Sequence, residues 1–303
     1  MSDFDLILDE RDEDRWNRLI DEINKKNVIP VIGADMLVEP KLTADGEHEN
    51  IHREIVSFIA SQTGVQSKPK TFSRLVFDHV YQSKVRKKEQ IYRIIDQVLS
   101  MLDKTGIDAT PSALLMDLLG TKKFPFVITT SFTPVVETAM EEIWGKGNVR
   151  TLQFNNNPQR SMIEDIGDIR TSADMKKPTV FYMFGKYSRT PFSYVVTDID
   201  MMDFCRSWLA GNGVPKKLVE ELKKKYLLVL GNNYSDWLFR FVWYSLRANM
   251  ETMKDDVVAG DSIDDSLAQF LECIETFTPG GLKGVVERIK NGVSGNADDE
   301  KCD

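Results

Sequence analysis

The chain has 303 residues, of which 42% are apolar, so it is long enough for one large domain or two small ones with a real core. Its net charge of −8 argues against nucleic acid as the main partner, because phosphate binding needs clustered lysine and arginine. Three cysteines without metal-ligand spacing, no secretory leader and no apolar run of about 18 residues predict a cytoplasmic protein with no membrane span and no metal site.

The chain is expected to begin with a helix and a buried strand. Within residues 1–26, Trp16, Leu19 and Ile23 recur at helical spacing, so we expect a separate N-terminal helix. Residues 28–33 form a short apolar run that ends in glycine. Such a run is typical of a buried parallel strand that enters a tight turn.

A helical insertion is predicted at about residues 47–120, where Ile51, Ile55 and Ile59 begin a series of apolar residues at helical spacing. Strand and helix patterns then alternate. The expected strands are residues 126–130, 149–154, 179–184, 193–197 and 226–231. The expected helices are residues 135–143, 198–209, 215–224 and 236–246. This alternation predicts a Rossmann-like α/β fold, with a parallel sheet, helices on both faces and a helical insertion after the first strand.

Four loops follow the predicted strands at their carboxyl ends, which is where parallel sheets bind ligands. Their sequences are Gly33-Ala34-Asp35-Met36, Thr130-Ser131-Phe132-Thr133, Phe184-Gly185 and Gly231-Asn232-Asn233-Tyr234-Ser235-Asp236-Trp237-Leu238. In this order, the loops resemble those of the SIR2-like family, the Rossmann-type domain of sirtuins and of bacterial defence NAD hydrolases. The resemblance covers residues 27–246, and we expect the domain itself to span residues 27–290.

The resemblance implies a site for NAD or an ADP-ribose-type nucleotide at these loops, with no metal. The residues that it assigns to nucleotide binding are Gly33, Ala34, Asp35, Met36, Thr130, Ser131, Gly185, Gly231, Asn232 and Asp236.

The residues that perform chemistry in the family are replaced in this chain. Ser131 stands where many members have asparagine, Thr133 where they have an acid, and Phe184 where active members have a histidine that acts as general base. A phenylalanine cannot exchange a proton near neutral pH. In the phosphate turn, Asp35 replaces a glycine and adds a negative charge, which disfavours a phosphate nearby.

Taken together, the resemblance implies a degenerate nucleotide-binding or assembly module of an antiphage-type defence protein, inactive as an isolated domain. The alternative is an active NAD nucleosidase that uses rearranged groups, for which Asp35, Asp198 and Asp236 are the candidates. Asp198 and Asp236 also have a simpler interpretation, because each precedes a predicted helix that it would cap.

The end of the chain predicts a connection to a further domain. Residues 291–303 are small, polar and acidic, as in a flexible linker. Their last three residues, Lys301-Cys302-Asp303, resemble the start of a TIR domain, which implies the N-terminal part of a SIR2–TIR protein. A homo-oligomer is also expected, because Phe241 and Tyr244 are three positions apart and would face a partner helix.

A rival motif is the H-E-x-x-H sequence from His48 to His52, which on a helix would place two imidazoles on one face for zinc. It would make the protein a zinc metallopeptidase. The polar, glycine-containing residues 43–47 before it and the lack of a third ligand motif argue against this function. We instead expect the motif at the start of an ordinary amphipathic helix, with both histidines near solvent.

Overall fold

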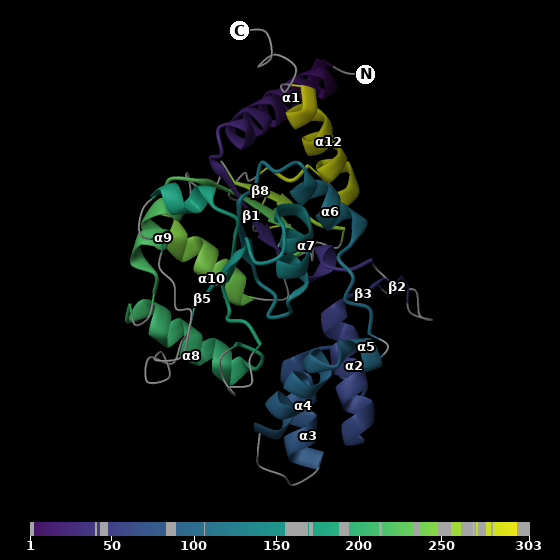
Figure 1. Ribbon diagram of the computed structural model, residues 1–303. Coiled ribbons are helices and arrows are strands. Elements are labelled where there is room, and N and C mark those ends of the chain that lie inside the picture. The colour runs from purple at the N-terminus through teal and green to yellow at the C-terminus, as the bar shows by residue number, and fades with distance from the viewer. Residues whose placement is uncertain are drawn as a thin grey trace.

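The computed structural model in Figure 1 describes residues 3–39, 41–42, 48–82, 89–105, 107–154, 169, 172–187, 194–211, 214–232, 237–247, 256–261, 269, 271, 277–279 and 281–295. A six-stranded sheet lies at its centre. The strands are β1 (Val28–Ile32), β4 (Phe126–Thr129), β5 (Arg150–Gln153), β6 (Thr179–Tyr182), β7 (Tyr226–Leu230) and β8 (Val257–Ala259).

The strand order is β5-β6-β4-β1-β7-β8, and every neighbouring pair is parallel. β1 lies between β4 and β7, so Val31 pairs with Ile128 on one side and with Val229 on the other. The strands that follow β1 are therefore added on one side of it, and the last two strands, β7 and β8, are added on the other side of β1. The predicted Rossmann-like α/β fold is confirmed.

Helices cover both faces of the sheet, and alternate strand residues enter two separate cores because side chains alternate along a strand. Val28 and Ile32 of β1 enter one core, and Ile29 and Val31 enter the other. The helices of the first core include α1 (Asp3–Asn24), α6 (Ala113–Gly120), α7 (Val135–Trp144) and α12 (Leu282–Gly295). Those of the second are α8 (Asp198–Leu209), α9 (Lys216–Leu222) and α10 (Trp237–Leu246). Burial on both faces explains the nearly continuous apolar strand sequences.

The predicted helical insertion follows β1. It contains the short antiparallel pair β2 (Lys41–Leu42) and β3 (His48–Glu49), and then α2 (Ile51–Thr63), α3 (Phe72–Gln82), α4 (Glu89–Ser100), α5 (Leu102–Thr105) and α6. Figure 1 shows α2 to α5 together on one side of the sheet, away from α1 and α12. α2 begins where the Asn50 side chain accepts a hydrogen bond from the Arg53 amide (3.1 Å), and it ends at Gly64 with a φ of 69°.

The structure differs from the sequence-based expectations at three places. Residues 194–197 form no strand; the Val195 amide donates to the Phe184 carbonyl (2.9 Å), just beyond β6, and no strand pairing is formed among the described residues. β8 was not predicted, since its three residues are too few to show a periodicity. Residues 291–295, expected as the start of a linker, continue α12. The remaining linker residues lie outside the described part of the chain.

Candidate functional site

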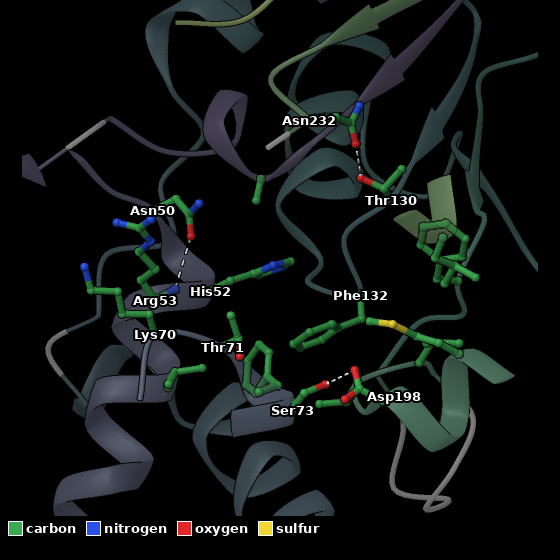
Figure 2. Close-up of a pocket in the computed structure, with 18 of the residues that line it drawn as sticks. Asn50, His52, Arg53, Lys70, Thr71, Ser73, Thr130, Phe132, Asp198 and Asn232 are labelled. Atoms are coloured by element: carbon green, nitrogen blue, oxygen red, sulfur yellow. Dashed lines mark hydrogen bonds between the residues drawn. The ribbon is translucent and has the colours of Figure 1, made fainter. Parts of the chain in front are cut away.

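The loops after β1, β4 and β7 meet at the carboxyl edge of the sheet. Gly33 donates its amide to the Leu230 carbonyl (2.8 Å), and Thr130 donates its amide to the Ile32 carbonyl (3.1 Å). The Thr130 hydroxyl donates to Oδ1 of Asn232 (2.7 Å), while Nδ2 of Asn232 donates to the Val31 carbonyl (3.3 Å). This network, part of which is drawn in Figure 2, fixes three loops against one another where the strand order reverses.

Two glycines allow this close approach. A Cβ atom on Gly33 would lie 2.4 Å from the Gly231 carbonyl oxygen. Gly231 has a φ of 65°, and a Cβ there would lie 2.8 Å from the Met36 amide nitrogen. Both glycines are therefore required for contact between the first and last loops. The turn after β1 is closed by protein at this point.

A cavity of about 320 Å³ opens beside these loops, and its volume is at the lower end of the range for ligand pockets. The sheet loops contribute Ala34, Thr130 and Asn232 to its wall. The helical insertion contributes a second wall, which includes His52, Arg53, Lys70, Thr71 and Ser73. Figure 2 shows how residues from these two parts of the chain face the same space. The cavity is thus shared between the sheet and the insertion.

Charge is distributed unevenly around the cavity. Arg53 and Lys70 both belong to the wall formed by the insertion, and both are labelled in Figure 2. Asp198 lies on another side, where it accepts a hydrogen bond from the Ser73 hydroxyl (2.9 Å). Asp35 is not part of the wall, and its carboxylate accepts a hydrogen bond from the Asn50 side chain (2.7 Å). The cationic side of the cavity is therefore the side formed by the insertion.

His52 makes the most specific contact between the insertion and the sheet. Its ring is stacked on Phe132, with centroids 4.9 Å apart and an angle of 9°, and its Nε2 lies 2.8 Å from Oγ of Ser131. Burial lowers the pKa of His52 to about 4, so the imidazole is neutral at pH 7. This histidine was expected near solvent, and it is instead half-buried between the cavity and the loop after β4, because α2 packs its first turn against that loop.

Ser131 and Thr133 complete this group, which we call the His52 cluster. Both side chains are buried, and their hydroxyl oxygens are 2.8 Å apart. The Thr133 amide donates to Oγ of Ser131 (3.1 Å), and the Ser131 amide donates to Oγ1 of Thr129 (3.1 Å). Ser131 therefore lies behind His52, which separates it from the cavity.

Phe184 forms part of the cavity wall without filling the cavity. Its ring is buried and meets Phe204 of α8 edge to face, at 5.2 Å and 81°. Gly185 follows with a φ of 81° and donates its amide to the Tyr182 carbonyl (3.3 Å). The phenylalanine therefore belongs to the core on the α8 side of the sheet, with its edge at the site.

The zinc hypothesis is wrong on geometry. His48 lies in β3, while His52 lies in α2, so the two histidines do not share a helix face. Among the residues that the structure describes, no group of three or more histidine, cysteine, aspartate or glutamate side chains is arranged to hold a metal ion. The apolar face expected for α2 is present, since Ile51, Ile55 and Ile59 are buried.

The structure separates the residues assigned to nucleotide binding into several places. Ala34, Thr130 and Asn232 line the cavity, while Gly33 and Gly231 contact each other behind it. Met36 is buried in the core and Ser131 lies behind His52. Asp35 and Gly185 are beside the site but not in its wall. Asp236 lies outside the described residues.

Asp198 does not cap α8, contrary to expectation. The cap is Thr197, whose hydroxyl accepts a hydrogen bond from the Asp200 amide (3.3 Å), while the Asp200 carboxylate accepts the Thr197 amide (2.9 Å). This reciprocal capping box leaves Asp198 in the first turn, at the cavity. Helix capping therefore does not explain the presence of Asp198 at this position.

A comparison with known protein families finds a match for the second half of the chain. Residues 125–272 match the family model of the SIR2-like domain. This segment, and not the whole chain, is similar to a SIR2-like domain. The matched segment of this chain starts at β4, so β1 and the helical insertion lie outside the match. No curated protein matches the chain.

The segment that matches the SIR2-like domain therefore supplies only part of the cavity wall. The residues that the loop motifs did not predict, His52, Arg53 and Lys70, all come from the insertion that precedes it. The available sequence signal was the position of His52 at the start of a helix, which does not reveal its contact with Ser131. None of the helices in the described ranges is long and apolar enough to cross a membrane.

Proposed function

We propose that the cavity binds an NAD-type nucleotide, either NAD or ADP-ribose. The observation that carries this proposal is the position of the cavity at the carboxyl ends of β1, β4 and β7, where the strand order reverses. Open α/β sheets bind their ligands at such points. The match of residues 125–272 to the SIR2-like domain supports a nucleotide of this class.

The groups around the cavity suit a ribose and its phosphates. Thr130, Asn232 and Asp198 provide hydroxyl, amide and carboxylate groups for sugar hydroxyls. Because the volume of about 320 Å³ is at the lower end of the range for ligand sites, a dinucleotide would fill the cavity and extend beyond it.

We further propose that the nucleotide is held intact. Phe184, which takes the place of the general base expected from the family resemblance, is a core side chain in contact with Phe204. Ser131 is buried behind His52, and Asp35 is turned to Asn50. This arrangement supports a degenerate module that binds a nucleotide, and it gives no support to catalysis by Asp35.

Isothermal titration calorimetry with NAD and ADP-ribose tests the binding, and nicotinamide release tests the chemistry. We expect binding to the wild-type chain, weakened roughly 2- to 10-fold in Thr130→Val because one hydrogen bond at the cavity is removed. Thr121→Val, far from the cavity, serves as the control. Nicotinamide release above background that falls in Ser131→Ala or Asp198→Asn would show an active NAD nucleosidase and contradict the proposal.

For the larger context, we propose a homo-oligomeric antiphage-type defence protein in which this chain precedes a TIR domain. The support is the family resemblance, together with exposed apolar side chains at Ile199, Met202 and Leu209 along one side of α8 and at Tyr244 on α10. Light scattering tests the assembly. Met202→Asp should lower the measured mass, Lys216→Asp on α9 should not, and a monomeric wild-type chain at high concentration would contradict the proposal.

A further inference from the structure

We propose that the phosphates of the bound nucleotide lie against Arg53 and Lys70 of the helical insertion, and not in the glycine turn after β1. This inference rests on the proposed function and names the subsite that determines the orientation of the ligand. Both residues lie outside the part of the chain that matches the SIR2-like domain, so the insertion would determine which charged groups the site accepts.

The turn after β1 is unsuited to a phosphate. A glycine in such a turn serves a phosphate when the backbone beside it is open, so that amide groups can approach the ligand. Here the space beside Gly33 is occupied by the Gly231 carbonyl and the Asn232 backbone, 2.4 and 2.5 Å from a Cβ atom. The Gly33 and Asp35 amides already donate to the carbonyls of Leu230 and Gly231 (2.8 and 3.0 Å). The carboxylate of Asp35 adds a repulsive charge.

The opposite wall has the complementary charge. Arg53 follows His52 in the first turn of α2, and Lys70 comes just before α3, so two separate segments bring their cations to one side of the cavity (Figure 2). A guanidinium and an ammonium at one place are the groups with which proteins bind phosphate.

Deeper in the cavity, the His52 cluster presents a neutral group. Oγ of Ser131 accepts the Thr133 amide, and among the described residues the Thr133 hydroxyl has no acceptor other than Ser131. When Thr133 donates its proton to Ser131, both acceptor positions of Ser131 are used, so Ser131 donates its own proton to Nε2 of His52. The remaining ring proton is then on Nδ1, because the hydrogen bond at one nitrogen fixes the tautomer.

His52 therefore offers an N–H donor without a charge, and its lowered pKa keeps it in this form at neutral pH. Such a donor suits a sugar or carbonyl oxygen, whereas the cations at Arg53 and Lys70 suit phosphate. The site thus has a charged end and a neutral end, both provided by the insertion. The nucleotide would enter with its uncharged sugar toward His52 and its phosphates toward α2 and α3.

Calorimetry on the full chain tests this orientation with four probes: ADP-ribose, NAD, adenosine and inorganic pyrophosphate. In Arg53→Ala and Lys70→Ala we expect the affinity for ADP-ribose, NAD and pyrophosphate to fall roughly 10- to 100-fold, with no change for adenosine. Arg93→Ala, at an exposed arginine of α4 outside the cavity, is the matched control. His52→Phe keeps the stacked ring and should weaken adenosine and ADP-ribose equally, by roughly 2- to 10-fold.

Asp35→Gly supplies the opposing test, because it restores the glycine of the family turn. A tenfold gain for pyrophosphate in this variant, with no loss in Arg53→Ala and Lys70→Ala, would place the phosphates after β1 and overturn the inference. The inference can also be separated from the proposed function. Pyrophosphate binding that depends on Arg53 without any binding of NAD or ADP-ribose would support the subsite and reject the nucleotide. Nucleotide binding that is unchanged in Arg53→Ala and Lys70→Ala would reject the subsite alone.

Discussion

The buried Asp256 and the half-buried His52 have different hydrogen-bond environments. Asp256 receives the Leu227 amide at 2.7 Å, Nε1 of Trp243 at 2.7 Å, and Nε and NH2 of Arg247 at 2.9 and 2.5 Å. Both its oxygens have two donors, and the residue is fully buried behind β7 and β8. His52 has one nitrogen bonded to Ser131, and its ring lines the cavity.

The comparison shows how hydrogen-bond satisfaction separates scaffold from site. A buried charge whose partners are complete holds neighbouring elements together and has no capacity left for a ligand. A half-buried ring at the cavity with one nitrogen directed away from its protein partner retains such capacity. Asp256 therefore stabilises the arrangement of β7 and α10, while the His52 cluster positions one donor at the cavity.

The largest expected effect is on Asp256. Asp256→Ala should lower the free energy of unfolding by about 3–5 kcal/mol, because Arg247 is left buried without its counter-charge. Urea unfolding followed by circular dichroism measures this change. The exposed pair of Asp203 and Arg206 provides the control, since Asp203→Ala should cost no more than about 1 kcal/mol. Equal costs for the two variants would contradict the distinction between buried and exposed ion pairs in this chain.

An intermediate effect is expected at Ser131. Ser131→Ala should lower the free energy of unfolding by about 1–3 kcal/mol, because the buried Thr133 amide and hydroxyl lose their partner. It should also weaken adenosine binding, since the tautomer of His52 is no longer fixed. Ser61→Ala, at an exposed hydroxyl of α2, should change stability by less than about 0.5 kcal/mol. A stability loss without any change in binding would limit Ser131 to a structural role.

The last expected effect, which is absent at neutral pH, is the contribution of His52 to the pH dependence of stability. Its pKa is about 4 in the folded chain and 6.5 as a free group, so the unfolded chain binds more protons between these values. This contribution is complete above pH 6.5 and is lost as the pH falls to 4. Chemical unfolding of the wild type and His52→Phe across this range measures it as a difference. Parallel stability curves for the two proteins would contradict the neutral, buried state of His52.

The sequence predicted the elements whose signal is local. The alternation of strands and helices indicated the parallel sheet, and the glycines after β1 and β7 marked the loops that meet at its edge. Residues 194–197 were misjudged because Tyr194 and Val196 are buried in alternation, as in a strand, without a neighbouring strand to pair with. Asp198 was misjudged because Thr197, one position earlier, is also a strong cap.

The site was predicted in part, since Ala34, Thr130 and Asn232 do line the cavity. The function of the glycines could not be read from their positions. Whether a glycine admits a phosphate or another loop depends on what lies within 3 Å of a Cβ placed on it, and at Gly33 that space is taken by a segment about 200 residues away. The same sequence motif therefore fits an open turn and a closed one.

The sequence by itself predicted the fold class, the order of the loops that follow the strands, and a phenylalanine at position 184 where the family resemblance implies a histidine. Each of these depends on patterns of residue types along the chain. Only the tertiary structure decided that a different histidine reaches the site. His52 and Ser131 are 79 positions apart, and their contact follows from the packing of α2 against the loop after β4. Apolar periodicity predicts that such a helix packs somewhere, but the partner is selected by the shape and hydrogen-bonding needs of both surfaces.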